Sequence, residues 1–429
     1  MGGSGFITLV NGTPYQWNRL GQQSMQMTTW DFPAQIPPQQ SISVLVEWGN
    51  EQSWAQSTYS LAGTGSIFQV QGVLGSLQVY LLAISTQNNA QDSAIILGWV
   101  PNDYVNFILS GREGNFSSSN MPAAWMQTNL TTLSKRPLRH LCISGTHDAG
   151  MHVATHLTPG AHNCNVLTQH ISIGSQLLAG SRYFDIRPVI RDGTYYTGHY
   201  SQQVVRNGPI EIRTLLGATG QAMQEIIDQI NFFTASNHEL IIIRLSHDMN
   251  TARGSRSDVA FTQAEWNGVM SLLSGTNHRF VALNPTTVDL TMLPLEQFIG
   301  QNKAAVIFIV RPTNTNISLG NFVHAGFYKY SQLDAYNVYS KTNNKDEMTR
   351  DQIEKMRTVR ITPDSQYFLL SWTLTQDKNQ ATRCSGGQAP SILELAAKAN
   401  PELYKQIISV CTSQSYPNIL YLDGTKTPM

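Results

Sequence analysis

The sequence of 429 residues is poor in charge, because only 13% of its residues are Asp, Glu, Lys or Arg, about half the usual share. The formal net charge is zero, which gives no electrostatic argument for nucleic-acid binding and does not predict strong adsorption to anionic membranes. No run of about 18 apolar residues occurs, so we expect no transmembrane helix. Amide and hydroxyl side chains replace the missing charges, a composition more common in secreted proteins.

The start of the sequence lacks the basic and apolar segments of a signal peptide. We nonetheless expect a secreted protein, either a mature form with a new start or one exported by another route. Cysteine is scarce, with four residues and none at the CxxC spacing of metal sites. We expect Cys142 to be a buried thiol in a strand. One disulfide between Cys384 and Cys411 is possible, although spacing alone leaves connectivity open and Cys164 is the fourth cysteine.

Residues 1–111 are predicted to be a small all-β sandwich. Ser41–Trp48 alternates polar and apolar residues, the pattern of a half-buried strand. Further strands are expected at residues 66–71, 76–84, 93–100 and 104–109, separated by Gly, Pro and Asn. We find no acid–base constellation there. With its Trp-Asp-Phe-Pro and Ile-Pro-Pro segments, the stretch from Phe6 to Trp48 distantly resembles membrane-active β-sandwich proteins of fungi and bacteria.

Residues 112–132 are predicted to hold a linker and a lead-in helix, since 111–120 is polar and rich in small residues. Residues 133–429 alternate between short apolar strands and helices. Strands are expected at 141–143, 183–187, 194–197, 239–245, 304–311, 368–372 and 418–423, and helices at 220–235 and 391–410. This alternation indicates an α/β fold, specifically a distorted TIM-type barrel. No glycine-rich phosphate loop follows a strand, so we expect no nucleotide cofactor.

Ionisable residues follow three successive predicted strands of this half. They are His147 and Asp148 in Ser-Gly-Thr-His-Asp, Asp185 and Arg187 in Phe-Asp-Ile-Arg, and His199 after Gly198. Strand ends carry the chemistry in parallel barrels. One imidazole can act as base and the other as acid, each oriented by a carboxylate. An arginine between them suits phosphate oxygens, so the set predicts phosphodiester cleavage.

These motifs resemble the X-region of the bacterial-type phosphatidylinositol-specific phospholipases C, over about residues 133–423. The resemblance implies that His147 is the general base for the inositol 2-hydroxyl, oriented by Asp423 after the last strand. It implies that His199, supported by Asp148, is the acid that protonates the diacylglycerol oxygen. A surface turn at Asp423-Gly424 is the alternative for that carboxylate.

The resemblance also implies substrate-binding residues. Arg187 would hold the phosphate, with Asp185 beside it. Looser matches are Arg311, at the end of a mid-barrel strand, and the pair Asp334 and Tyr336, which resembles the family's inositol-binding Asp-x-Tyr.

Two further positions in residues 133–429 do not have a single predicted role. Arg244 is either a second phosphate contact or a mid-strand residue paired inside the barrel. The family's lysine after the fourth strand is replaced here by Ser246-His247-Asp248.

No metal is predicted. Calcium-dependent relatives have Asn where Asp148 stands and an acidic ligand where Arg187 stands, so the resemblance implies a metal-independent site. His147, His152 and His156 suggest zinc by their spacing, but thiolate or carboxylate partners at metal spacing are missing.

The predicted function is a phosphatidylinositol diacylglycerol-lyase. The inositol 2-hydroxyl would attack the adjacent phosphorus, which gives diacylglycerol and inositol 1,2-cyclic phosphate. The expected partner is phosphatidylinositol at a lipid interface, approached by a monomer in peripheral contact with the membrane. One alternative is a membrane- or glycan-binding protein with a residual barrel. Another is a calcium-dependent diesterase, or one that cleaves glycosyl-phosphatidylinositol anchors.

Overall fold

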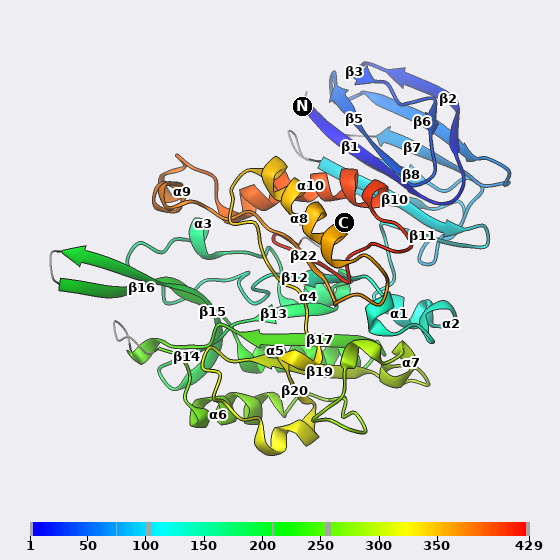
Figure 1. Cartoon of the computed structure of the whole chain (residues 1–429). Helices are drawn as coiled ribbons and strands as arrows, with labels where there is room; N and C mark the ends of the chain where they lie inside the picture. The colour runs from blue at the N-terminus through cyan, green and yellow to red at the C-terminus, as the bar shows by residue number, and fades with distance from the viewer. Residues whose placement is uncertain (1–2, 74, 100–103, 208–209, 254–258, 426–429) are drawn as a thin grey trace. The chain divides into compact units, whose positions relative to one another are not determined.

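The computed structural model describes residues 3–73, 75–99, 104–207, 210–253 and 259–425. The predicted strand at 93–100 therefore ends, at Val100, outside the described residues. The chain divides into two compact units: the first holds residues up to 122 together with 400–411, and the second holds 123–399 together with 412–427. The first unit is blue to cyan in Figure 1, apart from its C-terminal segment.

Up to residue 118, the described residues of the first unit form strands and no helix, as predicted. One sheet has the order β11-β10-β1-β5-β3 and the other the order β4-β2-β6-β7-β8-β9. The strands are β1 (Gly3–Gly12), β2 (Trp17–Met25), β3 (Met27–Trp30), β4 (Gln35–Ile36), β5 (Gln40–Trp48), β6 (Trp54–Leu61), β7 (Ile67–Val73), β8 (Ser76–Tyr80), β9 (Ala94–Gly98), β10 (Tyr104–Arg112) and β11 (Asn115–Ser118). Buried residues alternate along β5 in one sheet and β6 in the other, so each of these strands has one apolar face. One hydrophobic cluster draws on both sheets, with Trp17 packed edge-on against Phe68 at 4.9 Å.

The segment predicted to be a linker, residues 111–120, belongs to the first unit instead. β10 continues to Arg112 and pairs antiparallel with β11. Gly111 and Gly114 have φ of 89° and 81°, the left-handed region that glycine enters without steric cost. The small residues that suggested a linker therefore belong to a hairpin turn. The predicted lead-in helix is two short helices, α1 (Trp125–Thr128) and α2 (Leu130–Leu133).

The last long helix, α10 (Ile392–Val410), does not belong wholly to the predicted barrel half. Its residues from 400 onward are grouped with the first unit. There the Ser41 hydroxyl donates to the carbonyl of Lys405 at 2.9 Å, and the Lys405 ammonium lies 5.3 Å from the Tyr104 ring. The boundary at residue 133 therefore describes the second unit only in part.

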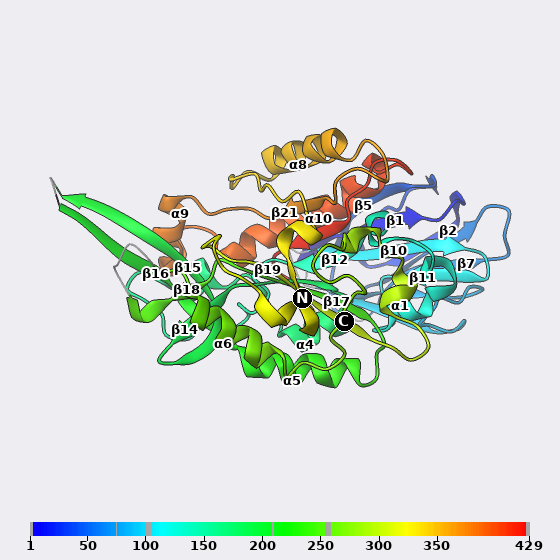
Figure 2. The ribbon, with the colours of Figure 1, turned by 60° about the horizontal axis from the view of Figure 1, so that its bottom comes forward.

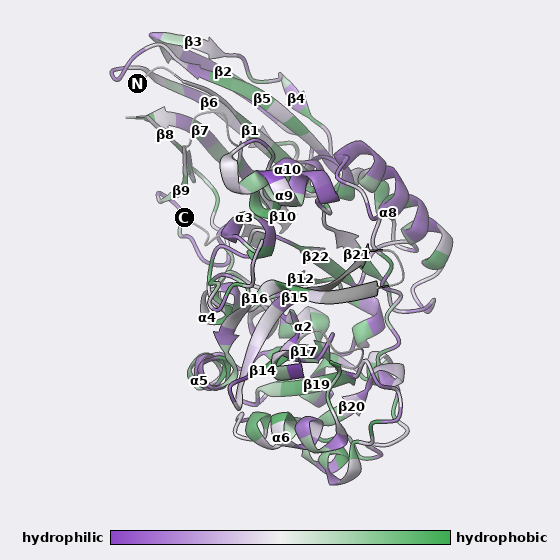
Figure 3. Ribbon diagram, turned by 90° about the vertical axis from the view of Figure 1, so that its left-hand side faces the viewer, coloured by the Kyte–Doolittle hydropathy of each residue, from purple (hydrophilic) through white to green (hydrophobic). Residues whose placement is uncertain are grey.

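The second unit is built on a seven-stranded sheet with the order β20-β19-β17-β13-β12-β22-β21, and all its pairings are parallel. Its strands are β12 (Ile143–Thr146), β13 (Tyr183–Ile186), β17 (Leu240–Ser246), β19 (Ala305–Arg311), β20 (Phe327–Lys329), β21 (Leu369–Trp372) and β22 (Ile419–Leu422). Every residue of β17 is buried, as expected for a parallel strand covered on both faces. Figure 3 shows β19 as mostly hydrophobic, and its one exposed residue is the terminal Arg311.

Alternate residues of these strands enter two different cores. Ile241 and Ile243 join a cluster with the buried faces of α5 and α6, whereas Leu240 and Ile242 join a second cluster that includes Tyr421. The predicted helix at 220–235 is confirmed as α5. Besides α1 and α2, the described helices of this unit are α3 (Asn163–Val166), α4 (Ile173–Leu178), α5 (Met223–Thr234), α6 (Gln263–Leu273), α7 (Leu295–Phe298), α8 (Lys345–Val359), α9 (Lys378–Arg383) and the first part of α10.

Closure of this sheet into a barrel is not seen among the described residues. The edge strands β20 and β21 are three and four residues long and do not pair with each other. Tyr336 makes one isolated parallel bridge with Phe368, beside β21.

The predicted strand at 194–197 lies outside the parallel sheet. It begins β15 (Thr194–Asn207), which pairs antiparallel with β14 (Pro188–Arg191) and β16 (Ile210–Ala222) in a sheet of order β16-β15-β14-β18, where β18 is Met249–Asn250. The β15–β16 hairpin extends far to the side in Figures 1 and 2. Asp192 and Gly193 both have positive φ. This Asp-Gly pair is the hairpin signal that the strand assignment missed.

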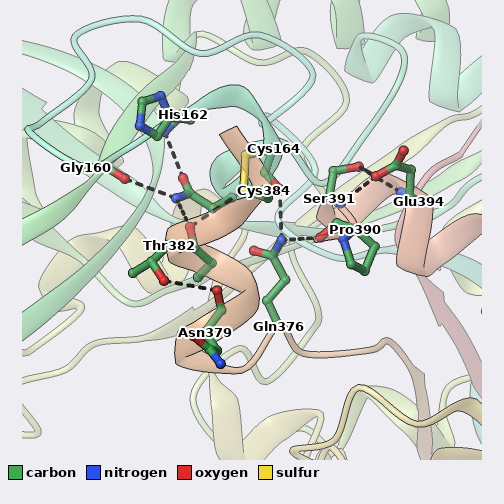
Figure 4. Close-up of a disulfide and its surroundings, with 12 residues drawn as sticks. Gly160, His162, Cys164, Gln376, Asn379, Thr382, Cys384, Pro390, Ser391 and Glu394 are labelled. Carbon is green, nitrogen blue, oxygen red and sulfur yellow. Dashed lines mark hydrogen bonds between the residues drawn. A yellow bond between two sulfur atoms is a disulfide. The ribbon is translucent and has the colours of Figure 1, made fainter. Parts of the chain in front are cut away.

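The cysteine predictions were wrong. The disulfide joins Cys164 to Cys384, whereas Cys411 lies at the end of α10. Cys142 is exposed, because it precedes β12 rather than lying inside it. Folding brings α3 beside the segment that follows α9, across a sequence separation of 220 residues (Figure 4). Spacing along the chain carries no information about such a long-range contact.

Candidate active site

His147 and Asp423 are neighbours because two parallel strands end together. β12 pairs with β22 in a register that sets Thr146 opposite Leu422, so the next residue of each strand is a site residue. His147 Nδ1 lies 2.7 Å from Asp423 Oδ1, and the Asp423 side chain is only 3% exposed. This carboxylate is therefore a buried partner of the imidazole rather than part of a surface turn.

The second ring nitrogen of His147 faces Arg187, with 2.6 Å between Nε2 and Nη2. A guanidinium can only donate, so Nε2 accepts and Nδ1 carries the proton given to Asp423. Burial disfavours the charged imidazole, but Asp423 outweighs burial and raises the pKa of His147, while Arg187 opposes the rise. In this geometry His147 is a neutral imidazole, and its unprotonated Nε2 accepts a hydrogen bond from the Arg187 guanidinium.

Asp185 is a buried carboxylate with several partners in the site. Its carboxylate accepts from the Tyr421 hydroxyl at 2.6 Å and from the Ser246 hydroxyl at 3.0 Å. Arg187 Nε lies 3.4 Å away and Arg244 Nη1 3.3 Å away. Burial favours the neutral acid, but Arg244 and Arg187 outweigh burial and hold the pKa of Asp185 well below its ordinary value. Arg244 is 3% exposed, so it lies inside the fold as an ion-pair partner.

Asp148 is the least satisfied group of the site. It is fully buried, and neither carboxylate oxygen accepts a hydrogen bond from any described residue. Arg187 Nη1 lies 3.2 Å from Oδ2 as an ion pair. Burial raises the pKa of Asp148 from its ordinary value of 3.8 to about 7, against the opposing charge of Arg187. This carboxyl group can therefore hold a proton near neutral pH.

His199 departs from the predicted arrangement in two ways. It lies inside β15 of the antiparallel hairpin, not at the end of a parallel strand. Its Nδ1 is 3.9 Å from Asp148 Oδ2, too far for a hydrogen bond, and instead lies 3.1 Å from the carbonyl oxygen of Val166. Burial lowers the pKa of His199 to about 3, and the charges of Arg187 and His147 add to this effect.

The carboxylates of the site are buried, whereas its nitrogen-bearing side chains are partly exposed. The carboxylates lie beneath, with side chains of Asp148, Asp185 and Asp423 exposed by 0%, 1% and 3%. The nitrogen-bearing side chains of His147, Arg187 and His199 are 20%, 15% and 25% exposed. A ligand therefore meets one guanidinium and two imidazoles first, an arrangement that suits an anion.

The remaining predicted residues are more loosely placed. Arg311 is exposed at the end of β19, and its guanidinium lies 4.5 Å over the Tyr330 ring, which Arg244 also approaches at 5.6 Å. Asp334 is exposed and accepts from Gln366 at 3.1 Å, and Tyr336 stacks on Phe368 at 5.5 Å. Among the described contacts, no hydrogen bond or ion pair joins these three predicted residues to His147 or Arg187.

Several supporting residues were missed from the sequence. Tyr421 lies two residues before Asp423, and the period of two along a strand was a usable signal for a shared face. Gln169 donates to the carbonyl oxygens of His147 and Leu422, at 2.8 and 3.1 Å, and holds the two strand ends together. No local signal marks this glutamine. His247, which the sequence did single out within Ser246-His247-Asp248, is exposed after β17, with φ of 56° and Nδ1 3.0 Å from the Ser246 hydroxyl.

No group of three or more His, Cys, Asp or Glu side chains in the described ranges is arranged to hold a metal ion. His156, the third histidine of the zinc spacing, has its Nδ1 2.9 Å from the hydroxyl of Thr219. Within the same ranges, no helix is both long and apolar enough to cross a membrane.

Comparison with known proteins gives similarity to solved structures alone. No family model matches the sequence, and no curated protein matches it. A mutant of the phosphatidylinositol-specific phospholipase C from Staphylococcus aureus is 17% identical, with a TM-score of 0.48, over 71% of this chain and 91% of that one. The phosphatidylinositol-specific phospholipase C from Listeria monocytogenes is 16% identical, with a TM-score of 0.46, over 71% of this chain and 94% of that one.

Proposed function

We propose that the second unit is a phosphodiesterase that cleaves phosphatidylinositol to diacylglycerol and inositol 1,2-cyclic phosphate. One observation carries this proposal: the Arg187 guanidinium contacts the His147 imidazole at 2.6 Å above three buried carboxylates. A cation, a base and a second imidazole, all partly exposed, match the needs of intramolecular phosphoryl transfer.

The base step follows from the Arg187–His147 contact. A bound phosphodiester would draw the guanidinium onto its oxygens, since a bidentate charged pair is stronger than a bond to a neutral ring nitrogen. His147 Nε2 would then be free to take the proton of the inositol 2-hydroxyl. Asp423 would stabilise the imidazolium through Nδ1, and the hydroxyl oxygen would attack phosphorus.

We assign the acid step of the reaction to His199. Without substrate its pKa lies at about 3, so the imidazole is neutral. A phosphodiester brings a negative charge to the site, which favours the imidazolium and raises this pKa. The protonated Nε2 would deliver its proton to the diacylglycerol oxygen as the bond from phosphorus to that oxygen breaks. Asp148 would support the charge from below.

The proposal extends to the fold, the substrate contacts and the location of the protein. The sheet would form a distorted TIM-type barrel, and the two sheets of the first unit a β-sandwich. Arg311, Asp334 and Tyr336 would contact the inositol ring at the rim. The protein would be a secreted monomer that works in peripheral contact with a lipid surface and needs no metal.

Phosphorus NMR of phosphatidylinositol in detergent micelles, with excess chelator, tests the proposal on wild type and His147→Ala. The wild type should give a cyclic phosphate resonance that the variant lacks. His324→Ala is the matched control, because this histidine is exposed in a 3₁₀ turn remote in sequence from the motifs, and it should behave as wild type. Loss of product in chelator would favour the calcium-dependent alternative. No product under any condition would refute the proposal.

A further inference from the structure

The orientation of His199 depends on one backbone carbonyl. Val166 O lies 3.1 Å from Nδ1, and the nearest carboxylate oxygen, on Asp148, is 3.9 Å away. A carbonyl oxygen only accepts, so Nδ1 must carry the proton. This contact leaves Nε2 as the nitrogen that gains and loses a proton, the atom that the acid step uses.

The peptide that supplies this carbonyl is not stable by itself. Val166 ends α3, a helix of four residues between irregular segments. A single helical turn has one or two internal hydrogen bonds to offset the cost of nucleation, so its position depends on tertiary contacts.

Three contacts hold α3 to the segment that follows β21 (Figure 4). Cys164 is joined to Cys384 by the disulfide. The Asn165 side-chain amide donates to the carbonyl of Ala381 at 2.9 Å, and Gln376 donates to the carbonyl of Cys164 at 3.3 Å. The disulfide is the covalent contact of the three, and it lies two residues from Val166.

We propose that the Cys164–Cys384 disulfide is a positioning element for catalysis, which fixes the tautomer of His199 by holding the Val166 carbonyl in place. The proposal rests on the proposed function for its kinetic part. A dithiol reductant would supply two electrons and two protons, break the sulfur–sulfur bond to two thiols, and become a cyclic disulfide. α3 would then be held by the two hydrogen bonds and by the packing of Val166 against Met151, Ala161 and Ala218, and the activity would respond to redox conditions.

The test uses the full chain with Cys164→Ser and Cys384→Ser together, and nitrogen-15 NMR of the histidine rings. Wild-type His199 should show a single tautomer with the proton on Nδ1, and the double variant a mixture of tautomers. His147 is an internal control, because Asp423 orients it independently of α3, and its signal should not change. The pair Cys142→Ser and Cys411→Ser is the matched control and should leave both signals unchanged.

The kinetic readout is kcat for phosphatidylinositol. We expect kcat to fall about tenfold in the double serine variant, the effect of one lost hydrogen bond to a charged group, with KM unchanged. A dithiol should reproduce the fall in wild type and have no further effect on the variant. A folded variant with the wild-type His199 tautomer and kcat would overturn the proposal.

Removing a disulfide that closes a long loop can cost about 5 kcal/mol, so circular dichroism must first show that the variant is folded. If it is not, wild type that is reduced by a dithiol while it remains folded tests the same idea. Asn165→Ala is then the matched variant, since it loses the contact with Ala381 but keeps the disulfide and should keep the His199 tautomer. An unchanged His199 tautomer in the reduced, folded wild type would count against the proposal. A wild type without lyase activity refutes the proposed function, yet the NMR result still decides whether the disulfide orients His199.

Discussion

Replacing Asp148 with Asn tests the electrostatics of the buried carboxyl group directly. Burial raises its pKa from 3.8 to about 7, which corresponds to about 4 kcal/mol. The folded protein binds this proton more tightly than the unfolded chain, so the free energy of unfolding falls as the pH rises between about 4 and 7. The amide keeps the shape of the acid but has no proton to lose, so this contribution to the fall should disappear.

Native-state hydrogen exchange at the buried amides of β17 measures unfolding of the second unit alone. The free energy of unfolding of Asp148→Asn minus that of wild type should rise by up to about 4 kcal/mol between pH about 4.5 and about 8. Other titrating groups are present in both proteins and largely cancel. Asp192→Asn is the control for the substitution itself, because that side chain is 83% exposed.

A difference for Asp148→Asn that stays within about 0.5 kcal/mol over this range would refute the reasoning. It would mean that the carboxylate is ionised throughout, with Arg187 at 3.2 Å supplying enough stabilisation to offset its burial.

Three further predictions concern the site. Arg187→Lys should lower kcat/KM by about 10²–10³-fold, because an ammonium cannot span His147 and two carboxylates; steady-state kinetics with Arg191→Lys as control checks this. Gly150→Ala would place a Cβ 2.3 Å from the Thr197 hydroxyl and should cost about 1–3 kcal/mol in thermal unfolding. Gly386→Ala, with no atom closer than 4.0 Å, should not. Finally, NMR titration should show His199 neutral from pH about 5 to 8, and saturating inorganic phosphate should raise its pKa; an imidazolium in the free protein at pH 6 would contradict the burial argument.

The sequence by itself determined the residue types of the site and most of the parallel strands. The runs 240–243 and 304–310 are apolar at every position, which is the pattern of strands buried on both faces. The resemblance paired His147 with Asp423, and the two side chains lie 2.7 Å apart because the parallel strands β12 and β22 end together.

Only the tertiary structure decided the parts that depend on contacts distant in sequence. His199 reaches the site from a hairpin and is held by Val166 rather than by Asp148, and nothing in its neighbours along the chain encodes that carbonyl. The disulfide between Cys164 and Cys384 spans 220 residues, and the local sequence does not encode this pairing either. Local patterns fix the period and burial of a strand, whereas long-range partners are set by packing of the whole chain, and the distances and pKa values that govern reactivity follow from that packing.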